Sequence, residues 1–342
     1  MYLDAPLRNL PLADVADEAR RLERMGFGAL WSFETSRDPF LPLLQAALAT
    51  ERLRMGTNIA VAFARTPFSM AMTAWDLQRA SAGRLLLGLG TQVRAHVERR
   101  FSAQFEHPAA RVTDYIRCLR VIWETFQSGA KPDYEGPFYR FKLINEMFTG
   151  GPIEHPHIPI FLAGVNPRMA RAAGEAADGF SVHPMHSPEY LREVVRPAID
   201  EGARTRGKTV EDIALVADCF IVRGSTERER NRAEEGVRQQ IALYASTPSY
   251  RGFLEFHGYP DIGKQLSAHM REGRLQDMPA LISDELLAAV AISEADGDLV
   301  GQIRERYAGG LVQRVLFYES VPEDADEDSM REFVGRVHGK AQ

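Results

Sequence analysis

The sequence predicts an α/β fold, and within that class a (β/α)8 TIM barrel, on three observations. Short β-rich runs alternate with amphipathic helical patterns eight times along the chain. Several runs, such as 158–163, are almost continuously apolar, as expected of parallel strands that are covered on both faces. No G-x-G-x-x-G motif follows the first run, so the barrel is favoured over the alternative, an open doubly wound sheet.

The individual elements follow from composition and from helix start signals. The predicted strands cover 2–5, 29–33, 53–63, 84–89, 158–163, 179–183, 213–222 and 312–318. Four helices begin with a capping residue followed by proline, whose missing N–H costs nothing in the first turn. These pairs are Asp38-Pro39, Thr66-Pro67, Asn166-Pro167 and Ser187-Pro188.

We expect the 342 residues to form one domain, 1–342, because α/β barrels exceed the usual domain size as a single unit. Two segments fall outside the eightfold alternation. Segment 129–157 contains 134–139, which predicts a turn or small hairpin, and 245–310 is a long, mostly helical insertion before the last strand. The insertion and its aromatic residues are interpreted either as a lid or wall of the substrate site, or as packing or an oligomer contact.

The composition, 45% hydrophobic and 26% charged, is that of an ordinary globular enzyme. A net charge of −6 without a lysine- or arginine-rich run argues against a nucleic-acid partner. No apolar run approaches the roughly 20 residues that span a bilayer, and the first residues lack the pattern of a signal peptide. We therefore expect no membrane partner and a cytoplasmic location, with Cys118 and Cys219 as buried thiols.

In a TIM barrel the chemistry is expected where strands end and the βα loops begin. These strand ends carry no histidine pair or recurring carboxylates of a metal hydrolase, and no G-x-S-x-G nucleophile. His155 and His157 precede the fifth strand and so belong to the opposite face, which argues against a metal site. Glycines and small polar residues at the strand ends suit an organic cofactor, because glycine lets backbone N–H groups approach phosphate and ring edges.

Four segments resemble the luciferase-like monooxygenase superfamily, in the right order over nearly the whole chain. The most specific are Met55-Gly-Thr-Asn-Ile-Ala-Val-Ala-Phe-Ala-Arg-Thr-Pro67 and Ser81-Ala-Gly-Arg-Leu-Leu-Leu-Gly-Leu-Gly90. His107-Pro-Ala-Ala-Arg111 and Ala163-Gly164 followed by Ala176-Ala-Asp-Gly179 continue the match. The pattern is most similar to the branch that uses the deazaflavin coenzyme F420. The other large branch uses reduced FMN and oxygen, and the resemblance also implies a homodimer.

The resemblance implies contacts with the cofactor ring. The family has a non-prolyl cis peptide on strand three, which here would be Asn58-Ile59; the alternative is an ordinary strand with Asn58 as a polar edge residue. Glu34 matches an acidic position near the ring edge and is a catalytic candidate as well. Its alternative role is a helix N-terminal carboxylate close to Arg37.

Further positions are expected to line the ring or the phosphate-bearing chain of the cofactor. Gly90, Thr91 and Gln92 follow the fourth strand. Gly164 and Val165 lie at a helix N-terminus, which can bind phosphate and be capped in the ordinary way at once. Arg111 is another phosphate candidate, with a structural salt bridge to Asp114 or Glu106 as the alternative.

One departure from the family pattern concerns proton transfer. Related F420-dependent sugar-phosphate dehydrogenases carry a glutamate after strand four and a histidine after strand two, where this chain has Val93 and Thr35. Their mechanism therefore does not carry over. His96 and His183 are the candidates that remain, each with a purely structural role as the alternative.

Three functions are consistent with the sequence. The first is an oxidoreductase that transfers a hydride between coenzyme F420 and a small organic substrate. The second is an FMN-dependent two-component monooxygenase that uses reduced flavin and oxygen. The third is a cofactor-free barrel that acts in binding or assembly.

Overall fold

The computed structural model describes residues 1–7 and 10–339, and within them eight parallel strands close into a barrel, as predicted. The barrel strands are β1 (Tyr2–Leu7), β2 (Ala29–Ser32), β3 (Arg54–Thr57), β5 (Leu85–Gly90), β8 (Ile160–Gly164), β9 (Gly179–Val182), β10 (Ala214–Val222) and β12 (Arg314–Phe317). Strand β1 pairs with both β2 and β12, and the pairing of β9 with β10 closes the ring. Closure leaves no barrel strand with a free edge.

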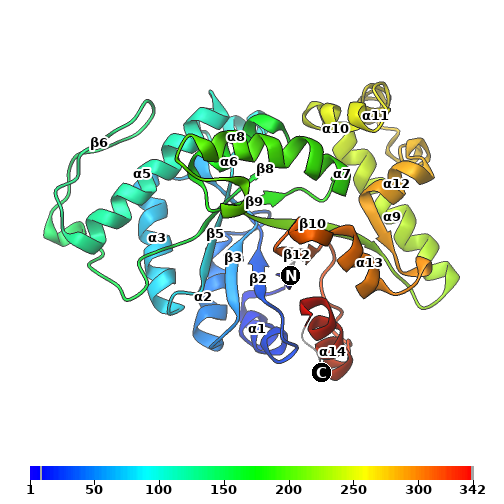
Figure 1. Ribbon diagram of the computed structural model, residues 1–342, viewed down its shortest axis with the longest axis horizontal. Coiled ribbons are helices and arrows are strands. Elements are labelled where there is room, and N and C mark those ends of the chain that lie inside the picture. Colours follow the sequence, from blue (N-terminus) through cyan, green and yellow to red (C-terminus); the bar gives the residue numbers. More distant parts are fainter. Residues whose placement is uncertain (8–9, 340–342) are drawn as a thin grey trace.

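Helices pack around the outside of the barrel and bury its outward-facing side chains (Figure 1). They are α1 (Val15–Arg24), α2 (Phe40–Ala49), α3 (Pro67–Ala80), α5 (Pro108–Ser128), α6 (Pro167–Ala176), α7 (Pro188–Tyr190), α8 (Arg196–Arg204), α9 (Glu227–Ala245) and α14 (Glu327–His338). Three of the four expected proline starts are confirmed, because the side chains of Thr66, Asn166 and Ser187 each accept a hydrogen bond from the third helical N–H. Helix α2 instead begins one residue late, with Pro39 in the capping position.

The remaining elements refine the predicted boundaries. The expected strand 53–63 is interrupted, because β3 ends at Thr57 and β4 (Ala60–Val61) pairs with β5 after a bulge. Helix α4 (Arg94–Arg99) was not predicted. The expected hairpin is present as β6 (Tyr134–Glu135) and β7 (Arg140–Phe141), and it projects from the left of the molecule in Figure 1.

The insertion before the last strand is mostly helical, as predicted, and also contains a short strand that was not. It comprises α10 (Arg251–Phe256), α11 (Ile262–Arg271), α12 (Asp284–Val290), β11 (Ala291–Ser293) and α13 (Leu299–Arg306). Strand β11 extends the sheet by pairing with the last residues of β10. Figure 1 shows α10, α11 and α12 gathered with α9 on the right of the molecule.

The barrel interior is a small core of its own, separate from the core under the helices. Its buried members come from five strands: Ala29, Trp31, Leu86, Phe161, Val216 and Leu316. Below them Asp4 and Arg314 form a buried ion pair, and the indole N–H of Trp31 donates to the same carboxylate. The interior is thus filled, as in other TIM barrels, which leaves the two ends for function.

Candidate active site

The inner face of the barrel continues beyond this core to the carboxyl ends of the strands. Because side chains alternate along a strand, Val216 is followed on the inner face by Asp218 and Phe220. By the same alternation the inner face carries Asn58, Gly88, Gly90, Ala163, Ser181, His183 and Tyr318. This opening, which we call the mouth, has two unlike halves. Asn58, Gly88, Gly90 and Ala163 from β3, β5 and β8 form one half. The other half is formed by β9, β10 and β12, where the polar Ser181 and Asp218 are followed by the larger rings of His183, Phe220 and Tyr318.

Asn58 lies at the centre of the mouth, and the bond between Asn58 and Ile59 is cis, which confirms the predicted peptide geometry. Its side-chain N–H donates to Asp218 at 2.9 Å, and its side-chain oxygen accepts from the Ser181 hydroxyl at 2.6 Å. The carboxylate of Asp218 can only accept, so this contact fixes which end of the amide is nitrogen. Asn58 is therefore held in one orientation by side chains from two other strands.

Glu34 pairs with residues of the segment after the cis bond, and not with Arg37. Its carboxylate accepts from the N–H of Val61 at 2.6 Å and forms a salt bridge with Arg65 at 2.8 Å. The expected neighbour Arg37 donates instead to the carbonyl of Leu10, so the alternative of an Arg37 contact is wrong. Glu34 therefore holds β4 in place after the bulge, and its carboxylate is partly occupied by the ion pair with Arg65.

The residues after β5 are closely packed. Gly90 is buried, and a Cβ there would meet the Ile59 side chain at 2.7 Å, so glycine at this position makes room for the residue after the cis bond. The buried Thr91 donates to the carbonyl of Gln92 at 3.3 Å. Gln92 is half-buried, has a positive φ of 56° and accepts from the N–H of Val93. Of these three predicted contacts, Gln92 has the most accessible side chain.

The end of β8 meets the first turn of α6 at Gly164 and Val165, both half-buried. Asn166 caps the helix by accepting from the N–H of Met169 at 3.1 Å. Arg168, in the first turn of α6, is exposed, and in the described part of the chain no acceptor pairs with its guanidinium. A cation beside a helix N-terminus is an anion-binding arrangement. The sequence analysis did not single out Arg168, although it directly follows Asn166-Pro167.

Arg111 contacts the segment that leads into α5 and the β6–β7 hairpin. Its Nε donates to the Tyr139 hydroxyl at 2.9 Å, and its Nη1 donates to the carbonyl of Gln104 at 2.7 Å. Neither Asp114 nor Glu106 is its partner, so the expected salt bridge is wrong. Asp114 instead accepts from backbone N–H groups of the β6–β7 hairpin. Arg111 therefore ties helix α5 to that hairpin.

The two candidate histidines have contrasting environments. His96 is exposed on the short helix α4, and no contact of its side chain joins it to the other predicted residues. His183 is half-buried at the end of β9, where its Nδ1 accepts from the N–H of Met185 at 3.2 Å and its Nε2 lies 2.8 Å from the Tyr250 hydroxyl. Burial lowers the pKa of His183 to about 3, with a further contribution from His186. His183 is therefore neutral at physiological pH.

The ring-bearing half of the mouth includes tyrosines from the insertion side. The rings of His183 and Tyr244 meet edge to face at 4.4 Å, and the Tyr244 hydroxyl lies 2.8 Å from that of Tyr318. Phe220 packs against Tyr318 at 4.6 Å. Tyr244 and Tyr250 thus contact the ring-bearing half of the mouth.

Other aromatic residues of the insertion serve packing instead. Phe253 and Phe256 pack on Tyr190, and the Tyr259 hydroxyl lies 2.8 Å from that of Ser283 within the insertion.

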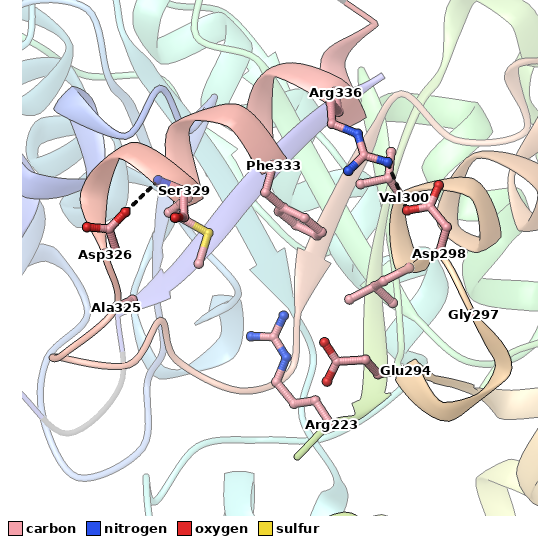
Figure 2. A pocket seen from close by; sticks show the side chains of 12 residues that line it. Arg223, Glu294, Gly297, Asp298, Val300, Ala325, Asp326, Ser329, Phe333 and Arg336 are labelled. Atoms are coloured by element: carbon pink, nitrogen blue, oxygen red, sulfur yellow. Dashed lines mark hydrogen bonds and ion pairs between the residues drawn. The ribbon is translucent and has the colours of Figure 1, made fainter. Parts of the chain in front are cut away.

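A cavity of about 320 Å³ lies elsewhere, between α13, α14 and the end of β10 (Figure 2). Figure 2 shows Arg223 and Glu294 on one side of it and Phe333 of α14 on the other. Phe333 packs on Phe317, whose side chain points out of the barrel. This cavity therefore lies outside the barrel.

Neither a metal site nor a membrane-spanning helix is present among the described residues. No group of three His, Cys, Asp or Glu side chains there could hold a metal ion. Likewise, no helix in residues 1–7 and 10–339 has the length and hydropathy needed to cross a membrane.

A closed parallel barrel with an inner-face site at its carboxyl end defines a TIM-barrel enzyme. Residues 3–314 match the family described as luciferase-like monooxygenase, and the chain belongs to that family.

The chain is similar to both uncharacterized and F420-dependent proteins. An uncharacterized protein of Mycobacterium tuberculosis is 44% identical over 316 residues, which cover 92% of each chain. A second protein of that organism, named "Putative coenzyme F420-dependent oxidoreductase", is 29% identical and covers 84% of this chain and 85% of its own. The solved coenzyme F420-dependent tetrahydromethanopterin reductase of Methanopyrus kandleri has the same fold, with a TM-score of 0.75, 22% identity and coverage of 98% and 97%. The relatives support an oxidoreductase.

Proposed function

We propose that this chain is a coenzyme F420-dependent oxidoreductase that passes a hydride between the deazaflavin and a small organic substrate. The division of the mouth carries the proposal. One half of the mouth includes three half-exposed residues with short side chains or close to the backbone bulge: Asn58, Ile59 and Ala163. We call this half, from β3 and β8, the low surface, and a planar ring fits against it. The opposite half offers aromatic faces to an organic substrate. The F420-dependent relatives named above support the choice of cofactor.

The donors of this chain suit the parts of F420 that would meet them. One hydrogen of the Asn58 amide is used by Asp218, and no acceptor among the described residues takes the second, so it is free to donate to the edge of the ring. Val165, two residues before α6, and Arg168 in the first turn of α6 place backbone N–H groups and a guanidinium near each other, which suits the phosphate. When bound, the deazaflavin supplies the hydride chemistry, and the chain orients the reactants.

We assign proton transfer to neither His96 nor Glu34. His96 is exposed on α4, and Glu34 is paired with Arg65. Gly90 and Arg111 support the site indirectly, since one accommodates Ile59 and the other holds a hairpin. His183 remains, as a neutral residue of the ring-bearing half.

Equilibrium titration of the purified protein with F420 and with FMN, followed by cofactor absorbance or fluorescence, tests the proposal. We expect F420 to bind and FMN to bind far more weakly. Tight FMN binding without F420 binding, with oxygen consumption when reduced FMN is supplied, would establish the flavin monooxygenase instead. Binding of neither cofactor would leave the barrel as a binding or assembly protein.

Replacement of Arg168 by glutamine should weaken F420 binding about tenfold, equivalent to about 1.4 kcal/mol, because an exposed charge-assisted contact to phosphate is lost. Added salt should weaken wild-type binding and have less effect on the variant. Arg232→Gln, an equivalent change of an exposed arginine on α9, is the matched control. Equal affinities of the wild type and Arg168→Gln would remove Arg168 from the phosphate site.

We also propose a homodimer, with a second copy of the chain covering the outer face of α2. Leu41, Leu44 and Leu48 are exposed there at helical spacing, with Leu48 72% exposed, and Met72 of α3 is exposed as well. Leu48→Glu should shift the protein from dimer to monomer in light scattering coupled to size exclusion. Leu275→Glu, at an exposed leucine of the insertion, should leave the mass unchanged. A Leu48→Glu protein that remains dimeric would place the interface elsewhere.

A further inference from the structure

Two histidine–tyrosine pairs lie near the mouth, and their hydrogen bonds have opposite directions. Both histidines are neutral, since burial lowers the pKa of His183 and of His186 to about 3. A neutral imidazole has one N–H donor and one bare acceptor nitrogen, so the partner of Nδ1 determines the state of Nε2. The backbone partners of the two rings differ, and they fix the two tautomers.

In the first pair, Nδ1 of His183 receives the N–H of Met185, so Nδ1 is bare and Nε2 carries the hydrogen. The Nε2–H therefore donates to the Tyr250 hydroxyl oxygen across 2.8 Å. This leaves the hydroxyl hydrogen of Tyr250 unused by His183. Among the described residues no acceptor lies within hydrogen-bond distance of it, although Tyr250 is only 7% exposed.

In the second pair, Nδ1 of His186 lies 2.9 Å from the carbonyl of His183, which can only accept. Nδ1 therefore carries the hydrogen, and the bare Nε2 accepts from the Tyr307 hydroxyl at 2.9 Å. The hydroxyl hydrogen of Tyr307 is thus consumed inside the protein. The contrast shows that a buried tyrosine beside a histidine can be satisfied here, and that Tyr250 is not.

A buried donor without an acceptor costs about 1–3 kcal/mol, so a ligand that supplies the acceptor is favoured at that place. Tyr250 stands beside His183 and the Tyr244 ring, in the half of the mouth that faces the low surface of Asn58 and Ile59. The surrounding rings are apolar on their faces. The unsatisfied hydroxyl is therefore the polar contact of an otherwise aromatic wall.

We propose that Tyr250 donates its hydroxyl hydrogen to the carbonyl oxygen of an apolar ketone substrate, with His183 as the residue that positions it. The inference rests on the proposed F420-dependent function, which supplies the reductant. As a hydride from the reduced deazaflavin forms a new bond to the carbonyl carbon, the C=O π electrons move to oxygen. That oxygen takes the proton of Tyr250, and the alcohol forms. The phenolate, held by the Nε2–H of His183, regains a proton from water after product leaves.

The tautomer can be tested without cofactor or substrate. Long-range 1H–15N correlation spectra of protein labelled with 15N-histidine distinguish the two ring nitrogens, and His183→Gln identifies the signal by its absence. We expect His183 to carry its hydrogen on Nε2, and His186, the internal reference, on Nδ1. A hydrogen on Nδ1 of His183 would mean that Tyr250 donates to the histidine, and would overturn the proposal whether or not F420 binds.

The catalytic role is tested by anaerobic oxidation of reduced F420 with cyclohexanone and acetophenone as probes. Tyr250→Phe should lower kcat by about a hundredfold or more, as for loss of a general acid, and should raise KM because the hydrogen bond to the carbonyl oxygen is lost, with little change in F420 affinity. Tyr259→Phe makes the same chemical change at an insertion tyrosine outside the mouth and should keep wild-type kcat. Undiminished kcat in Tyr250→Phe, or reduction of neither ketone by wild type that binds F420, would overturn the proposal. Failure of the wild type to bind F420 would contradict the proposed function instead.

Discussion

Replacing Arg314 by methionine should lower the free energy of unfolding by about 3–5 kcal/mol, the largest stability effect that we expect of any single charge. Asp4 is fully buried, and Arg314 contacts both of its oxygens, at 2.6 and 2.7 Å. Removal of the guanidinium leaves a buried carboxylate with the Trp31 indole as its remaining close donor. Urea unfolding followed by circular dichroism measures the change.

Two further variants make this expectation specific. Lys264→Met removes a surface ion pair with Asp261, whose side chains are 69% and 72% exposed, and should cost less than about 1 kcal/mol. The double variant Asp4→Asn with Arg314→Met removes both charges and should recover part of the loss, because no uncompensated ion stays buried. A loss in Arg314→Met no greater than that in Lys264→Met would show that the buried pair is not needed.

This ion pair also shows what the sequence could not predict. Periodicity located all eight strands, since alternation and apolar runs depend on neighbours along the chain. Asp4 and Arg314 join strands from opposite ends of the chain, and nothing local to either residue indicates the other. The same holds for Glu34, whose partner is Arg65 rather than its near neighbour Arg37. Arg111 likewise pairs across the β6–β7 hairpin rather than with nearby carboxylates.

The candidate site also has features that the sequence predicted and features that it did not. Family resemblance located the cis peptide at Asn58-Ile59. It did not predict the hydrogen bonds of Asn58 with Ser181 and Asp218, because those residues carry no motif and are found only by counting alternate positions on β9 and β10. The orientation of the His183–Tyr250 pair depends on one backbone N–H, that of Met185, whose direction no sequence pattern gives.

The glycines of β5 connect the site to the stability of the barrel. Gly88 faces β3, and a Cβ there would lie 1.7 Å from the backbone oxygen of Thr57, where nothing can yield without moving the strand. At Gly90 the obstacle is the flexible side chain of Ile59, at 2.7 Å. An added Cβ would thus clash with backbone at Gly88 and with a side chain of the mouth at Gly90. The two should respond differently to the same added methyl group.

Gly88→Ala should therefore be the more damaging change, costing about 3 kcal/mol or more in urea unfolding, since overpacking against backbone is hard to relieve. Gly90→Ala should cost about 1–3 kcal/mol, displace Ile59 and weaken F420 binding. Adding Ile59→Ala, which removes the obstructing carbons, should restore most of the stability of Gly90→Ala but not that of Gly88→Ala. Gly236→Ala on α9, where nothing lies within 4 Å, should be neutral or stabilising by up to about 1 kcal/mol. Equal losses at Gly88 and Gly90, both unrelieved by Ile59→Ala, would contradict this description of the β3–β5 contact.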